Sequence, residues 1–507
     1  MKAIKYLSIA ALASMMLQAC SGDYLDTEDR TALEPDAVAE AAGRNPDIFL
    51  NGMWAWTVDF GTLTATNIHD CYNTAFLLVS DCMSENMALS ASHWFNYDYQ
   101  FDFRMQSWRR PTTTWSVFYT AISKANEVIN LYPDGGETAA QKGLLGQALA
   151  MRAWAYDYLV QFFTHYIGAD GKINREAPGV PLMYTAADKD AEGNAYTVET
   201  IAAMKGRNNV GMVLDQAEAD LERAVELLGE GYERPADANG KDYIDLGVAN
   251  GLLARHYLLV QNWEGAAKAA KAARQGYSQR SASELNDGFM DVTASDVMWG
   301  FNHTADTSTV FASWFSHLSA FAPGYAGLGY CTKLIDARLY SQIPDDDYRK
   351  ALFNGPNGDP QQSTVGAQKP YAPLKFGNDG NWTMDYIYMR AAEMVLIEAE
   401  ALAHQGKSAE AATVMKELMA VRQPSWNKMQ VSVDDVLLQR RIELWGEGFG
   451  FFDLKRNNLG VDRTYEGNNH LEGFKVVVPP QDVRWTFQIP LSEIQENDLI
   501  SEDDQNP

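Results

Sequence analysis

Amphipathic helix patterns recur in pairs along this 507-residue chain and limit its fold more than any other feature of the sequence. In residues 114–131 the apolar side chains are three or four positions apart, which places them on one face of a helix. They are Trp115, Phe118, Ile122, Ala125 and Ile129. The same period predicts further helices over residues 142–163, 208–228, 244–260 and 263–274. Because such helices bury their apolar stripes against each other, we expect a mostly α fold.

Two of the helix pairs share a sequence pattern. Residues 252–267 and 397–412 carry large apolar and small residues at equivalent positions, and both end on an alanine pair. Helix–loop–helix units of about 34 residues, with small side chains where helices meet, resemble tetratricopeptide repeats. About four such units are expected, the last over residues 386–422. The predicted fold is therefore a tetratricopeptide-like helical-repeat scaffold.

The helical patterns are interrupted by residues 278–385, which are rich in Gly, Pro, Asn and aromatic residues and lack a sustained period. We expect this segment to form an irregular, loop-rich second lobe. The predicted organisation is a first helical part over residues 43–277, the irregular lobe over 278–385, and a C-terminal part over 386–507.

The N-terminus has the pattern of a secretory signal peptide over residues 1–19. Lys2 and Lys5 precede an apolar run over residues 6–17, which is too short to span a membrane. Leu17, Gln18, Ala19 and Cys20 close this region; they resemble a bacterial lipobox and imply that Cys20 is lipidated. Residues 20–42, which are acidic and poor in apolar side chains, would then tether the fold to the membrane. A plain signal peptide with an incidental cysteine is the alternative.

Charge and cysteine content narrow the classes of function. The formal net charge is −26, and nucleic-acid binding needs clustered Lys and Arg that this chain lacks, so we expect no nucleic-acid partner. With Cys20 lipidated, Cys71, Cys82 and Cys331 remain, an odd number that cannot all pair. A Cys71–Cys82 disulfide is one option that the sequence leaves open.

Charged and large apolar residues alternate in an unusual way over residues 439–456. Arg440, Glu443 and Glu447 fall at i, i+3 and i+7, so we expect them to pair along one helix face. Glycines at 446, 448 and 450 predict a turn, and residues 451–456 a second element. Charges among aromatic residues are costly unless paired, so the segment is interpreted as a salt-bridged core joint. A catalytic cluster is the less favoured alternative.

This segment resembles the signature of the SusD/RagB family of outer-membrane lipoproteins. The matching residues are Arg440, Arg441, Glu443, Leu444, Glu447, Gly448, Asp453, Leu454 and Arg456. Gly450 departs from the pattern, because the family usually has a basic residue there. The chain's ending, with Pro490, Glu493, Ile494 and residues 505–507, resembles the end of family members as well.

The resemblance implies a cell-surface lipoprotein of the outer membrane, attached through the lipid on Cys20. Such a protein captures an oligo- or polysaccharide and delivers it to a TonB-dependent, SusC-like transporter. It implies no catalysis and no cofactor, and we assign no residue to a catalytic role or to a metal.

Two concentrations of aromatic residues are candidates for the binding site. In residues 95–104 aromatic and polar side chains alternate, which predicts a strand with one aromatic face. Residues 310–330 form the second concentration. Sugar rings stack on aromatic side chains, and their hydroxyls bind carboxylates and amides. The candidate glycan-binding residues are Trp94, Tyr97, Trp314 and Tyr325 for stacking, and Asp81 and Asn96 for hydroxyls. For any single aromatic residue, a place in the core is the competing interpretation.

Two other functions stay open. The chain has no G-x-S-x-G, H-E-x-x-H or P-loop motif. A lipoprotein glycoside hydrolase needs two carboxylates at a separation that only three-dimensional structure reveals. A helical-repeat scaffold for protein partners would instead bury its aromatic residues and bind no sugar.

Overall fold

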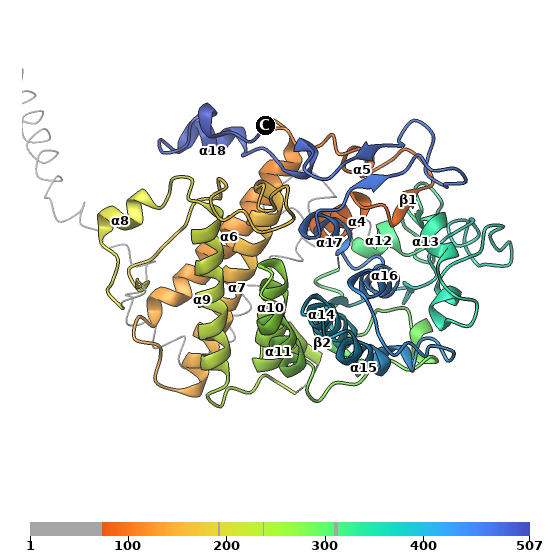
Figure 1. The fold of residues 1–507 in the computed structure, drawn as a ribbon, viewed down its shortest axis with the longest axis horizontal. Helices are drawn as coiled ribbons and strands as arrows, with labels where there is room; N and C mark the ends of the chain where they lie inside the picture. The colour runs from red at the N-terminus through yellow and green to blue at the C-terminus, as the bar shows by residue number, and fades with distance from the viewer. Residues whose placement is uncertain (1–73, 191–192, 237, 309–312) are drawn as a thin grey trace, which may run out of the picture.

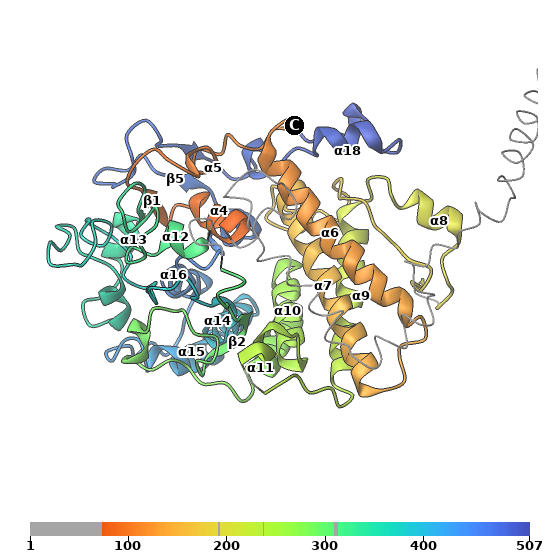
Figure 2. The same cartoon turned by 180° about the vertical axis from the view of Figure 1, so that it is seen from behind.

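The computed structural model describes residues 74–507 except 191–192, 237 and 309–312, and these residues form a mostly helical fold (Figures 1 and 2). The predicted signal peptide, Cys20, the tether, Cys71 and a helix expected over residues 47–60 lie outside the described residues. Among the described residues no helix is long and apolar enough to cross a membrane.

Long helices packed side by side form the scaffold (Figure 1). They are α6 (Arg109–Leu131), α7 (Ala139–Phe163), α9 (Val210–Leu228), α10 (Leu246–Leu259), α11 (Trp263–Ala273), α14 (Ala391–His404), α15 (Ser408–Met419) and α16 (Val433–Glu443). From α6 to α15 each of these helices packs against the next, and α16 packs against α14. The helices predicted from apolar periodicity are confirmed to within a few residues, and so is the mostly α fold. Although α11 and α14 are far apart in sequence, they pack against each other. The helices before and after the irregular segment therefore form one continuous array.

Side-chain caps start several of these helices. Thr138 accepts from Gln141 N in a capping box before α7, and Ser432 forms the same arrangement with Asp435 before α16. Asn209 and Asp245 are simple N-caps of α9 and α10, and the side chain of each accepts a hydrogen bond from the backbone N–H three residues further on. The local sequence therefore sets where these helices begin.

Short elements connect the irregular segment to the helices. Between α11 and α14 lie η4 (Glu284–Asn286), β2 (Val297–Phe301), α12 (Trp314–Leu318), β3 (Lys333–Ile335), α13 (Ala337–Ser341) and η6 (Tyr348–Leu352). Strand β2 pairs antiparallel with β4 (Tyr386–Arg390), and β3 pairs antiparallel with β1 (Met87–Leu89), with Met87 opposite Ile335. These ladders join the irregular segment to β1, near the start of the described chain, and to β4, which directly precedes α14. The domain boundaries assigned to it stay a prediction.

The remaining elements lie at the two ends of the described chain and between α7 and α10. At the N-terminal end are η2 (Thr74–Leu78), α4 (Val79–Cys82) and α5 (Asn96–Tyr99). Between α7 and α10 along the chain, in addition to α9, are α8 (Val198–Ala203) and η3 (Ala238–Asp242). At the C-terminal end are α17 (Gly450–Arg456), β5 (Val461–Asp462), β6 (Val477–Val478), η7 (Val483–Trp485), α18 (Leu491–Glu496) and η8 (Glu502–Asp504). Cys82 and Cys331 carry free, buried thiols.

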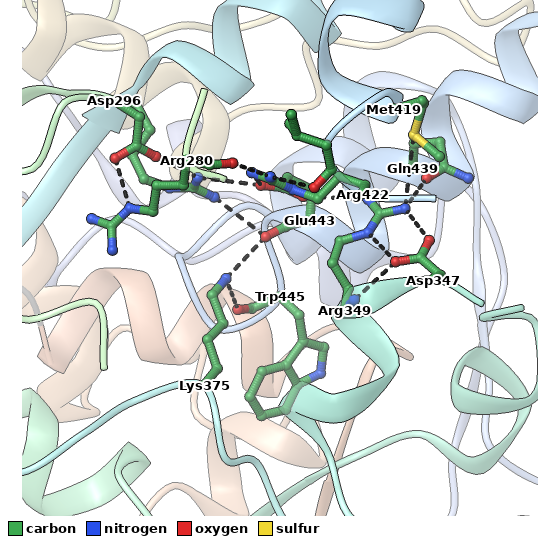
Figure 3. A network of polar contacts seen from close by, with 12 residues as sticks. Arg280, Asp296, Asp347, Arg349, Lys375, Met419, Arg422, Gln439, Glu443 and Trp445 are labelled. Carbon is green, nitrogen blue, oxygen red and sulfur yellow. Dashed lines mark hydrogen bonds and ion pairs between the residues drawn. The ribbon is translucent and has the colours of Figure 1, made fainter. Parts of the chain in front are cut away.

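Buried ion pairs join α16 to the irregular segment and to β4, and the predicted salt-bridged core joint is confirmed (Figure 3). The Glu443 carboxylate accepts from Arg422 Nε and Nη2, both at 2.9 Å, and from Arg349 and Arg390, both at 3.3 Å. Burial disfavours its charge, but these guanidinium groups prevail and hold the pKa of Glu443 well below its usual value.

The predicted pairing of Arg440, Glu443 and Glu447 along one helix face is wrong. Helix α16 ends at Glu443, so Glu447 lies beyond it and binds Lys375 and Arg390 instead. Arg440 Nε donates to Asp453 Oδ2 at 3.0 Å, across the turn between α16 and α17. Gly446 and Gly448 have positive φ and allow the chain to reverse direction after α16. Because of this turn, the three charged side chains point toward different elements.

Candidate functional site

A pocket of about 410 Å³ lies between the loop that precedes α5, the α5 turn itself and the start of α6. It is lined by Ser92, His93, Trp94, Phe95, Asn96, Tyr97, Asp98, Phe103 and Arg110. Three of the six residues proposed from sequence, Trp94, Asn96 and Tyr97, therefore line one cavity.

The predicted strand over residues 95–104 is wrong, because this segment folds as one helical turn between two tight reversals. Phe95 (φ +73°) and Phe101 (φ +61°) occupy the left-handed region, which costs a bulky residue energy. Both rings are buried, and Tyr99 N donates to Phe95 O at 2.8 Å. Burial of alternate aromatic residues therefore comes from a compact turn instead of a pleated strand, and Tyr97 projects from its opposite side.

A buried ion pair forms the floor of the pocket. Arg110 Nε donates to Asp98 Oδ1 at 2.8 Å, and Arg110 Nη2 donates to Asp98 Oδ2 at 3.0 Å. Both side chains are almost fully buried, and the guanidinium also lies 5.8 Å from the ring centroids of Phe95 and Phe103. The two-point geometry fixes α5 against the first turn of α6 and positions the residues between them.

Two groups of aromatic side chains, called walls here, each combine rings of the pocket lining with neighbouring rings outside it. The first wall consists of Trp94, His93, Tyr325 and Tyr330, with ring centroids 5.5 Å apart for His93–Trp94 and 6.3 Å for Trp94–Tyr325. The second wall consists of Tyr97, Phe103 and Trp108, with Tyr97 6.1 Å from Trp108. Trp94 is 38% exposed and Tyr97 51% exposed, which is unusual for such large rings. Both walls therefore offer ring surface to the solvent.

Hydrogen bonds of Tyr99 anchor the α5 turn from behind. Its hydroxyl contacts His470 Nδ1, and His470 Nε2 lies 3.0 Å from Asp336 Oδ2. Burial lowers the pKa of His470, and a neutral imidazole satisfies both contacts by accepting from Tyr99 and donating to Asp336. Tyr465 completes this relay by donating to Asp336 Oδ2 at 2.6 Å. The pocket is thus tied to the C-terminal region of the chain.

The structure does not bring Asp81 and Trp314 to the pocket. Asp81 is 4% exposed, and its carboxylate accepts from Gly448 N at 2.9 Å and Gly450 N at 3.1 Å. Trp314 is 8% exposed, and its ring packs 4.7 Å from that of Phe376. Neither side chain is available to a ligand in this arrangement. Tyr325, the sixth predicted residue, belongs to the first wall.

The contact of Asp81 also gives a reason for the glycine at position 450. A Cβ on Gly450 would lie 2.5 Å from Ser84 Cβ and 3.1 Å from Asp81 Oδ1. In this chain α17 approaches α4 too closely for the basic residue that family members usually have there.

Several residues in and beside the pocket could not be selected from the sequence. Arg110, Phe103 and Trp108 are separated from Trp94 by turns whose geometry only the fold reveals. The cluster of Trp108 with two arginines, so close to the aromatic run, was the one local signal that could have indicated Arg110.

Two family models match the chain. The one described as the SusD family matches residues 356–507, and the one described as "starch-binding associating with outer membrane" matches residues 61–258. Solved structures of the same superfamily match over nearly the whole length. The chain is therefore a member of the SusD-like family.

Three similar structures illustrate the extent of the match. A SusD-like carbohydrate-binding protein from Bacteroides vulgatus has a TM-score of 0.73 and 25% identity over 91% of this chain and 97% of its own. A SusD superfamily protein from Bacteroides thetaiotaomicron has a TM-score of 0.71 and 21% identity, with 92% and 99% covered. Surface glycan-binding protein A from Bacteroides uniformis has a TM-score of 0.64 and 17% identity, with 91% and 99% covered. Among curated proteins none matches this chain.

Proposed function

We propose that this protein is a glycan-capture lipoprotein of the outer membrane, and that the pocket between the two aromatic walls holds the glycan. The observation that carries the proposal is the exposure of Trp94 and Tyr97 in one pocket that also contains a buried ion pair. Apolar faces of sugar rings can stack on both walls, while Asn96 and Ser92 offer hydrogen bonds to hydroxyls. Membership of the SusD-like family and its outer-membrane description support the same function.

The walls suit a chain of sugars better than a single ring. Aromatic rings outside the lining adjoin two of its residues, with Trp108 beside Tyr97 and Tyr330 beside His93. A ligand that contacts both of these outer rings spans more than one sugar unit. We therefore propose an oligo- or polysaccharide ligand, held by Trp94, Asn96, Tyr97 and Tyr325 among others.

Hydrolysis at this pocket is disfavoured by its carboxylates. Glycosidases of the common types use two carboxylic acids that flank the bond to be cleaved. Among the residues that line the pocket, Asp98 is the only carboxylate, and both of its oxygens accept from Arg110. Capture without chemistry is therefore the better-supported function, and we expect no release of reducing sugar from a bound glycan.

Affinity electrophoresis of the mature chain in a mild detergent, through gels that contain single polysaccharides, tests the proposal. We expect at least one polysaccharide to retard the protein, and the Trp94→Ala/Tyr97→Ala variant to lose most of that retardation. Each stacked sugar ring contributes on the order of 1 kcal/mol, so the loss of both aromatic rings should weaken binding by about 2 kcal/mol, or roughly thirtyfold. Tyr348→Ala, which removes an equally exposed ring on η6, is the matched control. Retardation that survives in the double variant would place the site elsewhere.

We also propose that the captured glycan passes to a SusC-like, TonB-dependent transporter, and that lipidated Cys20 holds the protein at the outer membrane. This step rests on the family resemblance and on the outer-membrane description of the family. Affinity purification of the tagged chain from membranes of its own organism should recover a TonB-dependent barrel. Recovery of other proteins without such a barrel would favour the protein-scaffold alternative.

A further inference from the structure

The charges that face the pocket cancel each other. Asp98 and Arg110 are the only residues of its lining that carry a permanent charge, and they are joined by two hydrogen bonds. The imidazole of His93 also lines the pocket, and its pKa is lowered by burial and by the nearby Lys333 ammonium. At neutral pH the imidazole of His93 is therefore uncharged, and the lining as a whole is neutral.

The ammonium groups of Lys333 and Lys369, two lysines near the first wall, bind protein groups outside the pocket lining. Lys333 lies 5.3 Å from the Phe95 ring centroid, but it is fully buried and its Nζ donates to Cys331 O at 3.2 Å. Lys369 Nζ donates to Ser90 Oγ at 3.1 Å and Gly329 O at 3.0 Å. Neither belongs to the lining, so neither offers an N–H to a ligand in the pocket.

An anionic sugar would enter this environment at a cost. A carboxylate or sulfate that leaves water needs an opposite charge or several hydrogen-bond donors to offset its lost hydration. Arg110, the cation of the lining, already has a carboxylate partner in Asp98, and the whole chain carries a formal charge of −26. Aromatic walls and neutral polar groups match the hydroxyls and C–H faces of an uncharged sugar instead.

We propose that this pocket selects neutral glycans and discriminates against glycans that carry uronic acids or sulfate. This inference rests on the proposed function, because it assigns the substrate class of the same site. It also predicts that the affinity for the glycan is almost independent of salt, since ionic screening acts only on charged partners.

A chemically matched pair of polysaccharides tests the inference. The neutral polysaccharide that most retards the mature chain is compared with the same polymer after oxidation of part of its primary hydroxyls to carboxylates. We expect the oxidised polymer to bind at least about tenfold more weakly than the neutral polymer. The neutral polymer should bind equally at low and high salt. Equal or tighter binding of the oxidised polymer, lost in Trp94→Ala/Tyr97→Ala, would overturn the selectivity while leaving glycan capture intact. No retardation by any polysaccharide would overturn the proposed function itself.

Asp98→Asn tests the physical cause. It removes the negative charge and leaves the Arg110 guanidinium to a ligand, so the preference should shift toward the oxidised polymer by about tenfold. Asp434→Asn, which removes the same charge from an exposed position on α16, should leave the preference unchanged. Because Asp98→Asn could disturb the turn, Ser92→Lys adds an ammonium at an exposed position of the lining without touching the ion pair. An unchanged preference in Ser92→Lys would refute the role of pocket charge.

Discussion

Replacement of Glu443 by glutamine should destabilise the protein more than any other single neutralisation of a carboxylate at the core joint. Glu443 is almost fully buried and accepts from three guanidinium groups. Arg349 would keep Asp347, and Arg390 would keep Glu447 and Asp296. Of its partners among the described residues, Arg422 would keep the carbonyls of Arg280 and Val421, neither of which is a carboxylate.

The expected loss for Glu443→Gln is about 3–5 kcal/mol of unfolding free energy, because that is the cost of breaking a buried ion pair on one side. Urea unfolding, followed by circular dichroism, measures it as a lower midpoint at an unchanged slope. Glu472→Gln removes the carboxylate of the exposed pair with Lys475 and should change the unfolding free energy by less than about 0.5 kcal/mol. A loss below about 1 kcal/mol for Glu443→Gln would refute the assigned role of the joint.

The pH dependence of that variant provides an independent check. The pKa of Glu443 is well below 4.5 in the folded protein, so its contribution to stability is present above pH 4.5 and is lost as the pH falls toward the folded value. Glutamine cannot titrate. The difference in stability between the wild type and Glu443→Gln should therefore shrink as the pH is lowered below about 4.5.

Two further predictions concern the supports of the pocket and of the α4–α17 contact. Burial raises the pKa of Asp81 to about 7, so the folded state binds a proton that the unfolded state releases above pH 3.8. Stability should fall as the pH rises from about 4 to about 7, by up to about 1.4 kcal/mol per pH unit, and Asp81→Asn should remove this dependence in urea titrations at several pH values. Tyr99→Phe leaves His470 Nδ1 without its donor, which should cost about 1–3 kcal/mol of stability and weaken glycan retardation by loosening the α5 turn. If stability falls in Tyr99→Phe but retardation is unchanged, the relay supports the fold alone.

The elements that could be predicted from the sequence are those whose signal is local. The spacing of Trp115, Phe118 and Ile122 is a property of one helix, and the caps at Thr138 and Ser432 are set within four residues. The apolar spacing predicted the helices over residues 114–131, 142–163, 208–228, 244–260 and 263–274 nearly to their ends, whereas the caps were recognised only in the structure. The salt-bridged joint could be predicted as a feature too, because charges among aromatic residues need partners wherever those partners come from.

The identities of those partners could not be predicted. Glu443 binds arginines at positions 349, 390 and 422, which three separate elements deliver, and nothing in the local pattern distinguishes them from other arginines. The strand predicted over residues 95–104 was wrong for a different reason. Alternation of aromatic and polar residues satisfies a strand, but it equally satisfies a turn whose two ends adopt positive φ, and burial of Phe95 and Phe101 decides between them.

The same turn explains why binding residues and core residues alternate so closely. Within five positions Phe95 and Tyr99 face the core, Asp98 pairs with α6, and Asn96 and Tyr97 face the pocket. Each inward contact fixes the direction of an outward side chain one or two residues away, so the pocket needs no separate framework. A substitution at Tyr99 or Asp98 therefore acts on the ligand through the backbone of α5, whereas one at Trp94 or Tyr97 removes contact surface directly. The ratio of lost stability to lost affinity should separate the two kinds of residue.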